Sequence, residues 1–228
     1  MAAAGKGARM SEPVEGRGEA TRLALIHAAL DLFGAKGFEA ASTRAVAAAA
    51  GANLASIAYH FGGKRGLRLA CADYVIGSIR DALAAPVAAA SGGLLTPAAA
   101  RALLPTVLDA IFSFIVVRPE AQSIVRFMIR EMFEPTEVFE RFYAEAFAPL
   151  HERFCSVWAT ATGASASSPE TRLATLAMLG QILYFRVGRP IAMRRLGWSE
   201  IGPREGAAIR VALTAHLEAA LAAAEGRG

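Results

Sequence analysis

The chain has 228 residues, of which 54% are hydrophobic, and alanine supplies much of that share. Because alanine has the highest intrinsic helix propensity, and segments rich in β-branched and aromatic residues are scarce, the composition predicts an all-α fold. Two cysteines, Cys71 and Cys155, lie too far apart for a disulfide framework or a zinc site. We therefore expect no metal and no cofactor.

The net charge of +4 is concentrated at one end of the chain. Residues 1–70 contain nine basic and five acidic side chains, whereas the remainder is balanced. Such an excess weakly favours a polyanionic partner. The most apolar stretch, residues 103–117, is shorter than the roughly 20 residues that span a bilayer, and no apolar segment follows Lys6 and Arg9. These features predict a cytoplasmic protein with no membrane segment.

The first elements have clear boundaries. Residues 1–18 lack apolar periodicity and are expected to form a disordered tail. Order should begin near Glu19, because apolar residues then recur at spacings of three and four, which is typical of an amphipathic helix. That stripe consists of Leu23, Ile26, Leu30 and Phe33. Gly37 is expected to end this helix.

Two short helices follow. Ser42 or Thr43 can cap a helix that runs through Ala50, Gly51 interrupts it, and Asn53 can cap a third helix that ends at Gly62 and Gly63. This arrangement predicts a helix-turn-helix, whose second helix can enter the major groove of DNA. Its inner face is expected to consist of Val46, Ala50, Ile57 and Phe61.

The rest of the chain is also predicted to be helical. A long helix from Lys64 to about Ala85 should be followed by a loop over residues 86–97. Further helices are expected over residues 97–117, 119–133, 136–162, 169–196 and 203–224. Pro149 and Pro190 fall inside apolar patterns and should kink or interrupt their helices.

At the helix-turn-helix the sequence resembles a known family. The ordered segments LDLFGAKGFEA, STRAVAAAAG and ANLASIAYHFGGKRGL closely resemble the TetR-family DNA-binding domain. The longer run AGANLASIAYHFGGKRGLRLACADYV is most similar to the branch with a CerR-like C-terminal domain, and RFMIREMFEPTEVFERFYAEAFAPLHERF supports that branch less specifically. The resemblance implies a helix-turn-helix domain over residues 19–66 and a helical ligand-sensing and dimerisation domain over residues 67–228.

The resemblance also implies roles for individual residues. Thr43 and Tyr59 would bind backbone phosphates through their hydroxyls, and Lys64 would add a charged phosphate contact, which holds register without reading sequence. Arg44 is the best candidate for a base contact, because its guanidinium can address guanine O6 and N7. Further candidates for reading bases are Asn53, Ser56 and His60, with Leu54 or Ala55 against a thymine methyl. Asn53 is equally well explained as a helix cap.

Aromatic residues and methionines are concentrated in the second half of the chain. At helical spacing they are most often core, but the resemblance implies a largely apolar pocket for a small-molecule effector among these helices. The candidate lining residues are Phe112, Phe127, Arg130, Phe142, Tyr143, Phe147, Gln181 and Tyr184. For Arg130, a structural pair with Glu131 is the stronger alternative.

The last two long helices carry leucine-rich stripes. In the TetR family such helices pair with a second subunit, and a two-fold dimer would match a pseudo-palindromic operator in double-stranded DNA. The alternative is that both stripes are buried within one subunit. The resemblance implies a repressor that an effector releases, or alternatively a sensor that acts through a protein partner without specific DNA binding. HExxH, GxSxG, P-loop and Rossmann motifs are absent from the sequence, so we expect no enzyme.

Overall fold

The computed structural model describes residues 14–91 and 95–225, and no strand occurs within those ranges. The all-α expectation is confirmed. The chain divides into two compact units, residues 1–71 and 72–228, which we describe separately.

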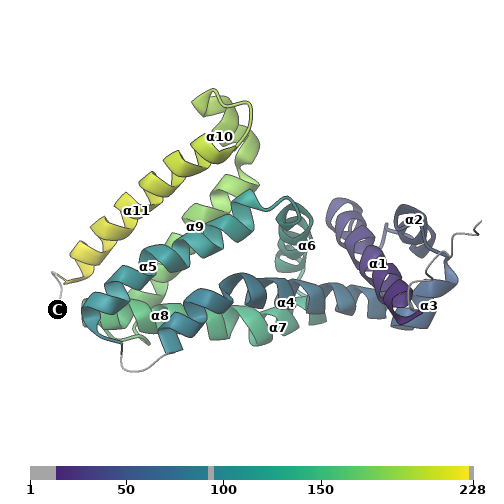
Figure 1. Ribbon diagram of the computed structural model, residues 1–228, viewed down its shortest axis with the longest axis horizontal. Helices are drawn as coiled ribbons and strands as arrows, with labels where there is room; N and C mark the ends of the chain where they lie inside the picture. The colour runs from purple at the N-terminus through teal and green to yellow at the C-terminus, as the bar shows by residue number, and fades with distance from the viewer. Residues whose placement is uncertain (1–13, 92–94, 226–228) are drawn as a thin grey trace, which may run out of the picture. The chain divides into compact units, whose positions relative to one another are not determined.

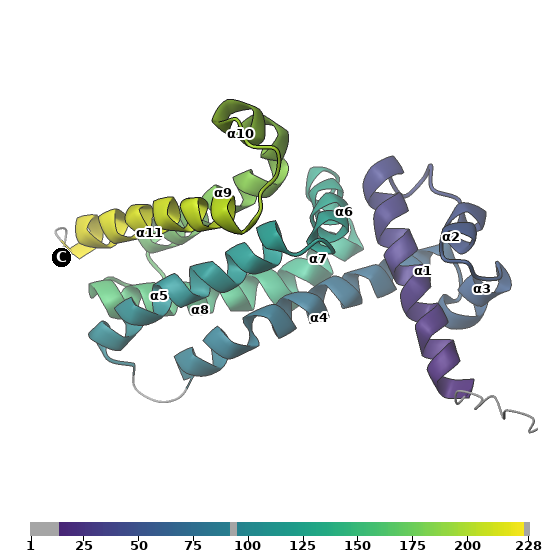
Figure 2. The ribbon, with the colours of Figure 1, turned by 45° about the horizontal axis from the view of Figure 1, so that its top comes forward.

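The first unit contains α1 (Val14–Lys36), α2 (Thr43–Ala49), α3 (Ala55–Phe61) and the beginning of α4 (Lys64–Ser91). Helices α2 and α3 lie against each other and against α1 (Figures 1 and 2). Helix α1 begins at Val14 rather than near Glu19, so the predicted disordered tail extends too far; residues 1–13 lie outside the described residues. In this first part of α1 the Thr21 hydroxyl donates to the Arg17 carbonyl at 2.9 Å, and Arg22 pairs with Glu19 three residues before it at 3.2 Å, contacts that support a helix.

The core of this unit confirms two of the four residues of the predicted inner face. Val46 and Ile57 are almost fully buried, together with Leu30 and Phe33 of α1. Ala50 and Phe61 are only half-buried, and Ala47 takes the buried position on α2 instead. Two helices of seven residues each would be unstable alone, so this shared core holds them in place.

Side-chain caps and glycines define the turn between α2 and α3. The Ser42 hydroxyl accepts a hydrogen bond from the Ala45 N–H at 3.1 Å, and the Asn53 Oδ1 accepts one from the Ala55 N–H at 2.9 Å. Both satisfy N–H groups that a helix start leaves open. Gly51 and Gly62 adopt φ values of 62° and 69°, which side chains with a Cβ rarely accept. The predicted caps and stops are therefore confirmed.

The second unit contains the remaining helices. They are α5 (Pro97–Phe112), η1 (Ser113–Val117), α6 (Ala121–Phe133), α7 (Glu137–Phe142), η2 (Tyr143–Phe147), α8 (Ala148–Thr162), α9 (Pro169–Val187), α10 (Arg189–Leu196) and α11 (Pro203–Glu225). The predicted breaks at Pro149 and Pro190 are confirmed, since α8 and α10 begin immediately before these prolines.

Helix α4 corrects one expectation. It continues to Ser91 with Pro86 inside it, so residues 86–91 are helical and not the predicted loop. The alanines around Pro86 have the highest helix propensity, and Pro86 itself is buried. Packing and propensity together outweigh the lost backbone hydrogen bond of one proline.

Two π-helical segments each precede a proline, and an arginine from another helix supports each one. Pro149 has no N–H for the Glu145 carbonyl four residues before it, and the Arg80 Nη2 of α4 donates to that carbonyl at 2.9 Å. Pro119 likewise has no N–H for the Ile115 carbonyl four residues before it. That carbonyl accepts a hydrogen bond from the Arg186 Nε of α9 instead. The arginines thus satisfy carbonyls that the helix itself leaves open.

The core of the second unit lies between α5, α8, α9 and α11, which pack along one another (Figure 2). Trp158, Phe112 and Leu217 are among its most buried side chains. The segments Pro97–Val117 and Pro203–Ala224 are long and apolar enough to span a membrane by length and composition. Both contribute buried residues to this core.

Candidate functional site

The exposed face of α2 and α3 carries most of the predicted DNA-contacting residues. Tyr59 is 84% exposed, and Arg44, Asn53, Leu54 and Ala55 are also exposed. Ser56 and His60 are half-buried, and the His60 ring lies edge-on to that of Tyr59 at 4.9 Å. These residues lie on the side away from the buried Val46 and Ile57, so the structure brings them together on one polar surface.

Thr43 and Lys64 border this surface. Thr43 is the first residue of α2, directly after the Ser42 cap. The Lys64 Nζ donates to the Glu39 carbonyl at 3.2 Å and lies 4.5 Å from the centre of the Phe38 ring. Arg68 lies over the same ring at 4.4 Å. The Lys64 ammonium is therefore positioned by the protein, which limits the rotamer entropy it can lose in binding a phosphate.

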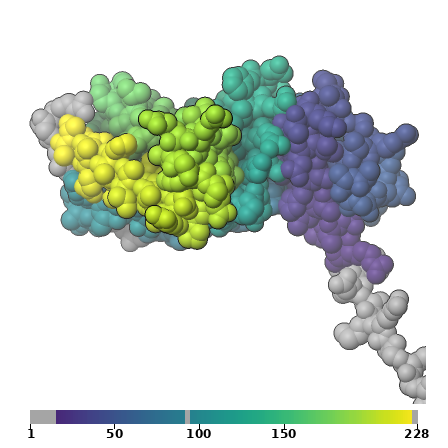
Figure 3. All heavy atoms as spheres, turned by 90° about the horizontal axis from the view of Figure 1, so that it is seen from above, coloured from purple at the N-terminus to yellow at the C-terminus, as the bar shows by residue number. Residues whose placement is uncertain are grey.

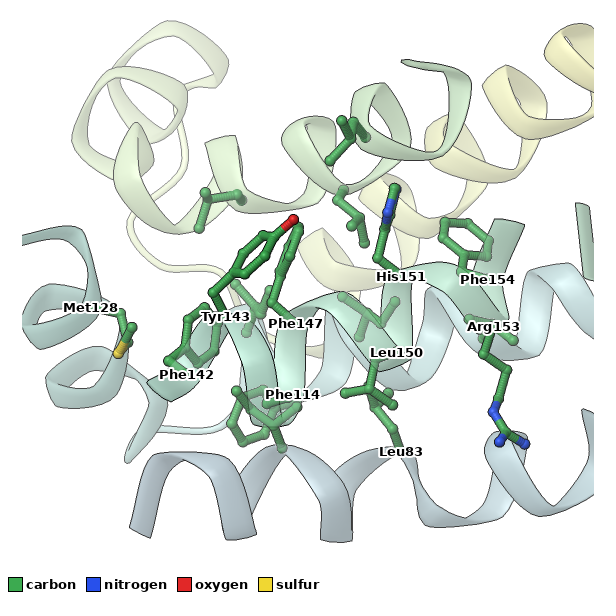
Figure 4. Close-up of a pocket in the computed structure, with 18 of the residues that line it drawn as sticks. Leu83, Phe114, Met128, Phe142, Tyr143, Phe147, Leu150, His151, Arg153 and Phe154 are labelled. Carbon is green, nitrogen blue, oxygen red and sulfur yellow. The ribbon is translucent and has the colours of Figure 1, made fainter. Parts of the chain in front are cut away.

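The second unit contains a cavity of about 500 Å³ between α4, α5, α6, α8 and α9. Its walls are almost entirely carbon, and this volume is in the range typical of small-molecule sites. Leu83 of α4, Phe114, Met128 and Leu150 of α8 contribute to the wall (Figure 4). Leu183 of α9 also lines the cavity.

Three of the eight residues predicted to line a pocket do so. Phe142, Tyr143 and Phe147 line the cavity, whereas Phe112, Phe127, Arg130, Gln181 and Tyr184 do not. Phe112 and Phe127 are buried core residues. The remaining three lie elsewhere on the second unit.

The polar candidates have other surroundings. Arg130 is exposed, while the buried Glu131 accepts a hydrogen bond from the Thr136 hydroxyl at 2.5 Å. Gln181 Oε1 lies 2.7 Å from the His216 Nδ1 of α11, and Tyr184 is half exposed. A helical pattern gives the face of a residue but not which neighbouring helix it meets, so these five residues were assigned to the wrong side.

One wall of the cavity is a series of stacked rings. Phe139, Tyr143, Phe147 and His151 follow at intervals of four residues along α7, η2 and α8, and all four line the cavity. Successive ring centres are 6.2, 6.0 and 5.6 Å apart, with interplanar angles of 26°, 25° and 11°. Figure 4 shows the Tyr143 and Phe147 rings side by side, with His151 farther along α8. We call these four residues the ring series.

His151 ends the ring series in a small polar cluster. Its Nε2 lies 2.9 Å from the Thr175 hydroxyl, and the buried Cys155 Sγ lies 3.3 Å from the same hydroxyl. Burial lowers the pKa of His151 from its usual 6.5, and a backbone hydrogen bond with Arg172 opposes part of this shift, while the charges of Arg172 and Glu152 have smaller, opposite effects. The imidazole is therefore neutral at pH 7.

Sequence reasoning missed Phe139 and His151 as cavity residues. The signal was present in the repeated spacing of four, which places side chains on one helical face. No group of His, Cys, Asp and Glu side chains within residues 14–91 and 95–225 is arranged to hold a metal ion.

Three polar contacts connect α4 to the helices of the ring series. In addition to the contact between Arg80 and Glu145, Asp73 pairs with Arg141 at 2.9 Å. Near the end of α4, the Arg153 guanidinium donates to the Ser91 hydroxyl. Because of these contacts, a movement of α7, η2 or α8 would either be resisted by α4 or move α4 with it.

Helices α9, α10 and α11 leave apolar side chains uncovered. Leu173 is 69% exposed, Val211 is 71% exposed, and Tyr184, Val187 and Ile191 are also exposed. In the space-filling view α10 and α11 form part of the outer face of the second unit (Figure 3). The predicted stripe Ile209, Leu213, Leu217 and Leu221 of α11 is buried within this subunit, so the alternative of intramolecular burial is correct for that stripe.

Comparison with known families gives two matches that cover most of the chain. The model for bacterial regulatory proteins of the TetR family matches residues 25–71. The model for the C-terminal domain of the HTH-type transcriptional dual regulator CecR matches residues 100–224. The CecR regulator of Shigella flexneri is 31% identical over 205 residues, covering 89% of this chain and 92% of that protein.

Solved structures show the same fold. The regulator AibR, in complex with isovaleryl coenzyme A and operator DNA, superposes with a TM-score of 0.62 at 15% identity, covering 85% of this chain and 95% of that one. A transcriptional regulator from Pseudomonas aeruginosa PAO1 gives 0.61 at 20% identity and covers 96% of both chains.

Proposed function

Because the chain belongs to the TetR family of bacterial regulatory proteins, we propose that it is a repressor which binds a pseudo-palindromic operator as a homodimer and is released by a small, largely apolar effector. Residues 19–66 would form the DNA-binding domain and residues 67–228 the sensing and dimerisation domain, acting in the cytoplasm. The observation that carries this proposal is the exposed polar face of α2 and α3, which presents Arg44 and Tyr59 beside a positioned Lys64.

Each residue of that face has a chemical role in the proposal. Thr43, Tyr59 and Lys64 contact phosphates and set the register of α3 in the major groove. Arg44 addresses a guanine through its two parallel N–H donors. Asn53 acts mainly as a cap, since its Oδ1 already accepts the Ala55 N–H, while its amide NH2 group can still donate to a base or phosphate.

The exposed apolar side chains of α9 and α11 support the dimer. Leu173, Tyr184, Val187 and Val211 lie on surfaces that water would otherwise cover, and burying them against a second copy provides a hydrophobic driving force. A two-fold dimer would present two copies of α3 to two half-sites one helical turn apart.

The cavity supports the effector. A ligand that favours one conformation shifts the equilibrium only if it binds the two conformations differently. Displacement of the ring series would act on α4 through Arg80, Asp73 and Ser91, and α4 begins directly after the helix-turn-helix. AibR was solved with both an acyl coenzyme A and operator DNA, a precedent for one member of this fold binding both kinds of partner.

Binding to the DNA upstream of the protein's own gene tests the proposal. A mobility shift over a series of salt concentrations should show specific binding that weakens as salt rises. Tyr59→Ala removes an exposed side chain and should abolish specific binding without loss of folding, whereas Arg195→Ala, which removes an exposed cation on α10, should leave binding unchanged.

A genome-wide selection of bound fragments completes the test, since the operator can lie elsewhere. Enrichment of one pseudo-palindromic sequence by the wild type, and not by Tyr59→Ala, supports the proposal. If the wild type enriches no sequence, the proposal fails, and a sensor acting through a protein partner becomes the better account.

A further inference from the structure

The ring series gives one wall of the cavity a distinct chemistry. Four flat rings, from Phe139 to His151, are presented along a continuous line, and the angles between neighbours fall from 26° to 11°. Each ring lines the cavity. Aliphatic side chains, among them Leu83 and Leu183, form other parts of the wall. The cavity wall is therefore not uniformly aliphatic, since one side is lined by aromatic rings that stack on one another.

One ring nitrogen of His151, Nε2, is directed to a protein partner. The Thr175 hydroxyl has one proton, which it can donate to the Thr171 carbonyl at 2.9 Å. It then accepts a hydrogen bond from the His151 Nε2 at 2.9 Å. The imidazole is thereby fixed against α9, and its ring face extends the ring series, parallel to Phe147 within 11°.

Among the described residues that line the cavity, Arg153 is the one charged side chain. Its guanidinium donates to the Ser91 hydroxyl, and Figure 4 shows the side chain extending away from the ring series. Transferring an unpaired charge into a carbon-walled cavity is strongly unfavourable. The part of a ligand that enters the cavity must therefore be uncharged.

From the ring series and these contacts we infer that the effector is a flat, uncharged aromatic ring system that lies against Phe139, Tyr143, Phe147 and His151. This inference rests on the proposed function and specifies its ligand. Offset stacking between aromatic rings stabilises a contact beyond the apolar area it buries, by roughly twofold to tenfold in affinity. A saturated ring system of the same skeleton buries similar area but cannot stack.

Calorimetric titration of the full-length protein with two matched probes tests the inference. The probes are 2-naphthol and its saturated counterpart decahydro-2-naphthol, which share a carbon skeleton and a hydroxyl. The wild type should bind 2-naphthol more tightly by roughly twofold to tenfold. Phe147→Leu and Phe139→Leu keep an apolar side chain but remove one aromatic ring of the series, so at least one of them should reduce this preference.

Phe114→Leu is the matched control, because Phe114 lines the same cavity outside the ring series. It should retain the preference for 2-naphthol. Circular dichroism melting establishes that each variant folds, and two variants at different positions guard against one that does not. Equal binding of the two probes by the wild type, no detectable binding of 2-naphthol up to its solubility limit, or an unchanged preference in both variants would overturn the inference.

Failure of the inference can be told apart from failure of the proposed function. The titration reports occupation of the cavity in the absence of DNA, whereas the mobility shift reports DNA binding in the absence of a ligand. A protein that binds its operator but prefers decahydro-2-naphthol remains a regulator with an aliphatic effector. A protein that prefers 2-naphthol but binds no DNA retains the cavity chemistry and loses the proposed role.

Discussion

The proposed DNA-binding surface and the cavity have opposite physical chemistry. The surface of α2 and α3 is largely polar, with Tyr59 84% exposed and Arg44 in solvent. The cavity has walls that are almost entirely carbon, and His151 and Arg153 at those walls are hydrogen-bonded to α9 and α4. Binding at the first should depend steeply on salt, whereas binding at the second should depend on apolar area and ring stacking.

This difference means that the two functions can be altered separately by substitution. A change on α2 or α3 should alter DNA affinity without affecting the cavity, and a change inside the cavity should do the reverse. Only the contacts from α4 to α7, η2 and α8 should affect how binding at one site changes binding at the other. The predictions below test this separation.

The largest effect is expected at Arg44. Arg44→Ala removes a guanidinium able to form two hydrogen bonds with a guanine, and should lower specific affinity by about fivefold to 150-fold, with relaxed preference at one base pair. Fluorescence anisotropy with operator fragments measures this. Arg195→Ala is the control, and an equal loss in both variants would show that only general charge had been removed.

A second, smaller effect is expected inside the cavity. Leu183 lines it, and Leu183→Trp adds bulk there, which should weaken 2-naphthol binding by about tenfold or more because overpacking is unfavourable. DNA affinity should stay within about twofold of the wild type, with Leu183→Ile as the volume-matched control. Strong loss of DNA binding in a folded Leu183→Trp variant would contradict the separation.

Arg80 should show a smaller effect that concerns both regions. Arg80→Met removes the donor to the Glu145 carbonyl, and should reduce the free energy of unfolding by about 1 kcal/mol. Probe affinity and DNA affinity should each change little, but the probe should release DNA less effectively. Urea denaturation measures the stability, and a mobility shift with competing probe measures the release of DNA. If the probe releases DNA from Arg80→Met as completely as from the wild type, this contact does not couple the two sites.

The smallest effect is expected from the titration of His151. Its pKa is lower in the folded protein than the usual 6.5, so the unfolded chain takes up a proton at a higher pH than the folded one. The stability that the neutral imidazole contributes is therefore present above about pH 6.5 and declines as the pH falls through the folded pKa. The difference in Tm between the wild type and His151→Gln should shrink on acidification. A difference in Tm that stays constant with pH would contradict this role of the His151 titration.

How far the sequence predicted the structure depended on whether the signal was local. Ser42, Asn53 and Gly62 act on their own helix ends, so the caps and stops of α2 and α3 could be predicted from their neighbours alone. The cavity depends on which helices meet in space. The family resemblance made Gln181 a candidate for the pocket, yet it contacts His216 of α11, 35 residues away.

The ring series is intermediate between these cases. Its spacing of four was visible in the sequence, but the continuity of Phe139, Tyr143, Phe147 and His151 passes through the π segment η2. Pro149 predicted an interruption there, and no local rule predicted that Arg80 of α4 would satisfy the Glu145 carbonyl. In this proposal, long-range contacts of this kind carry the coupling between the two sites, and they could not be predicted from the sequence.

The most direct test of the central claim, that occupation of the cavity controls DNA binding, is a reciprocal titration. The affinity for 2-naphthol is measured for the free protein and for the protein saturated with operator DNA, and the DNA affinity is measured with and without saturating probe. Linkage requires both ratios to be the same, and the account predicts weaker probe binding in the DNA complex by about fivefold or more. Equal probe affinity with and without DNA would contradict the claim.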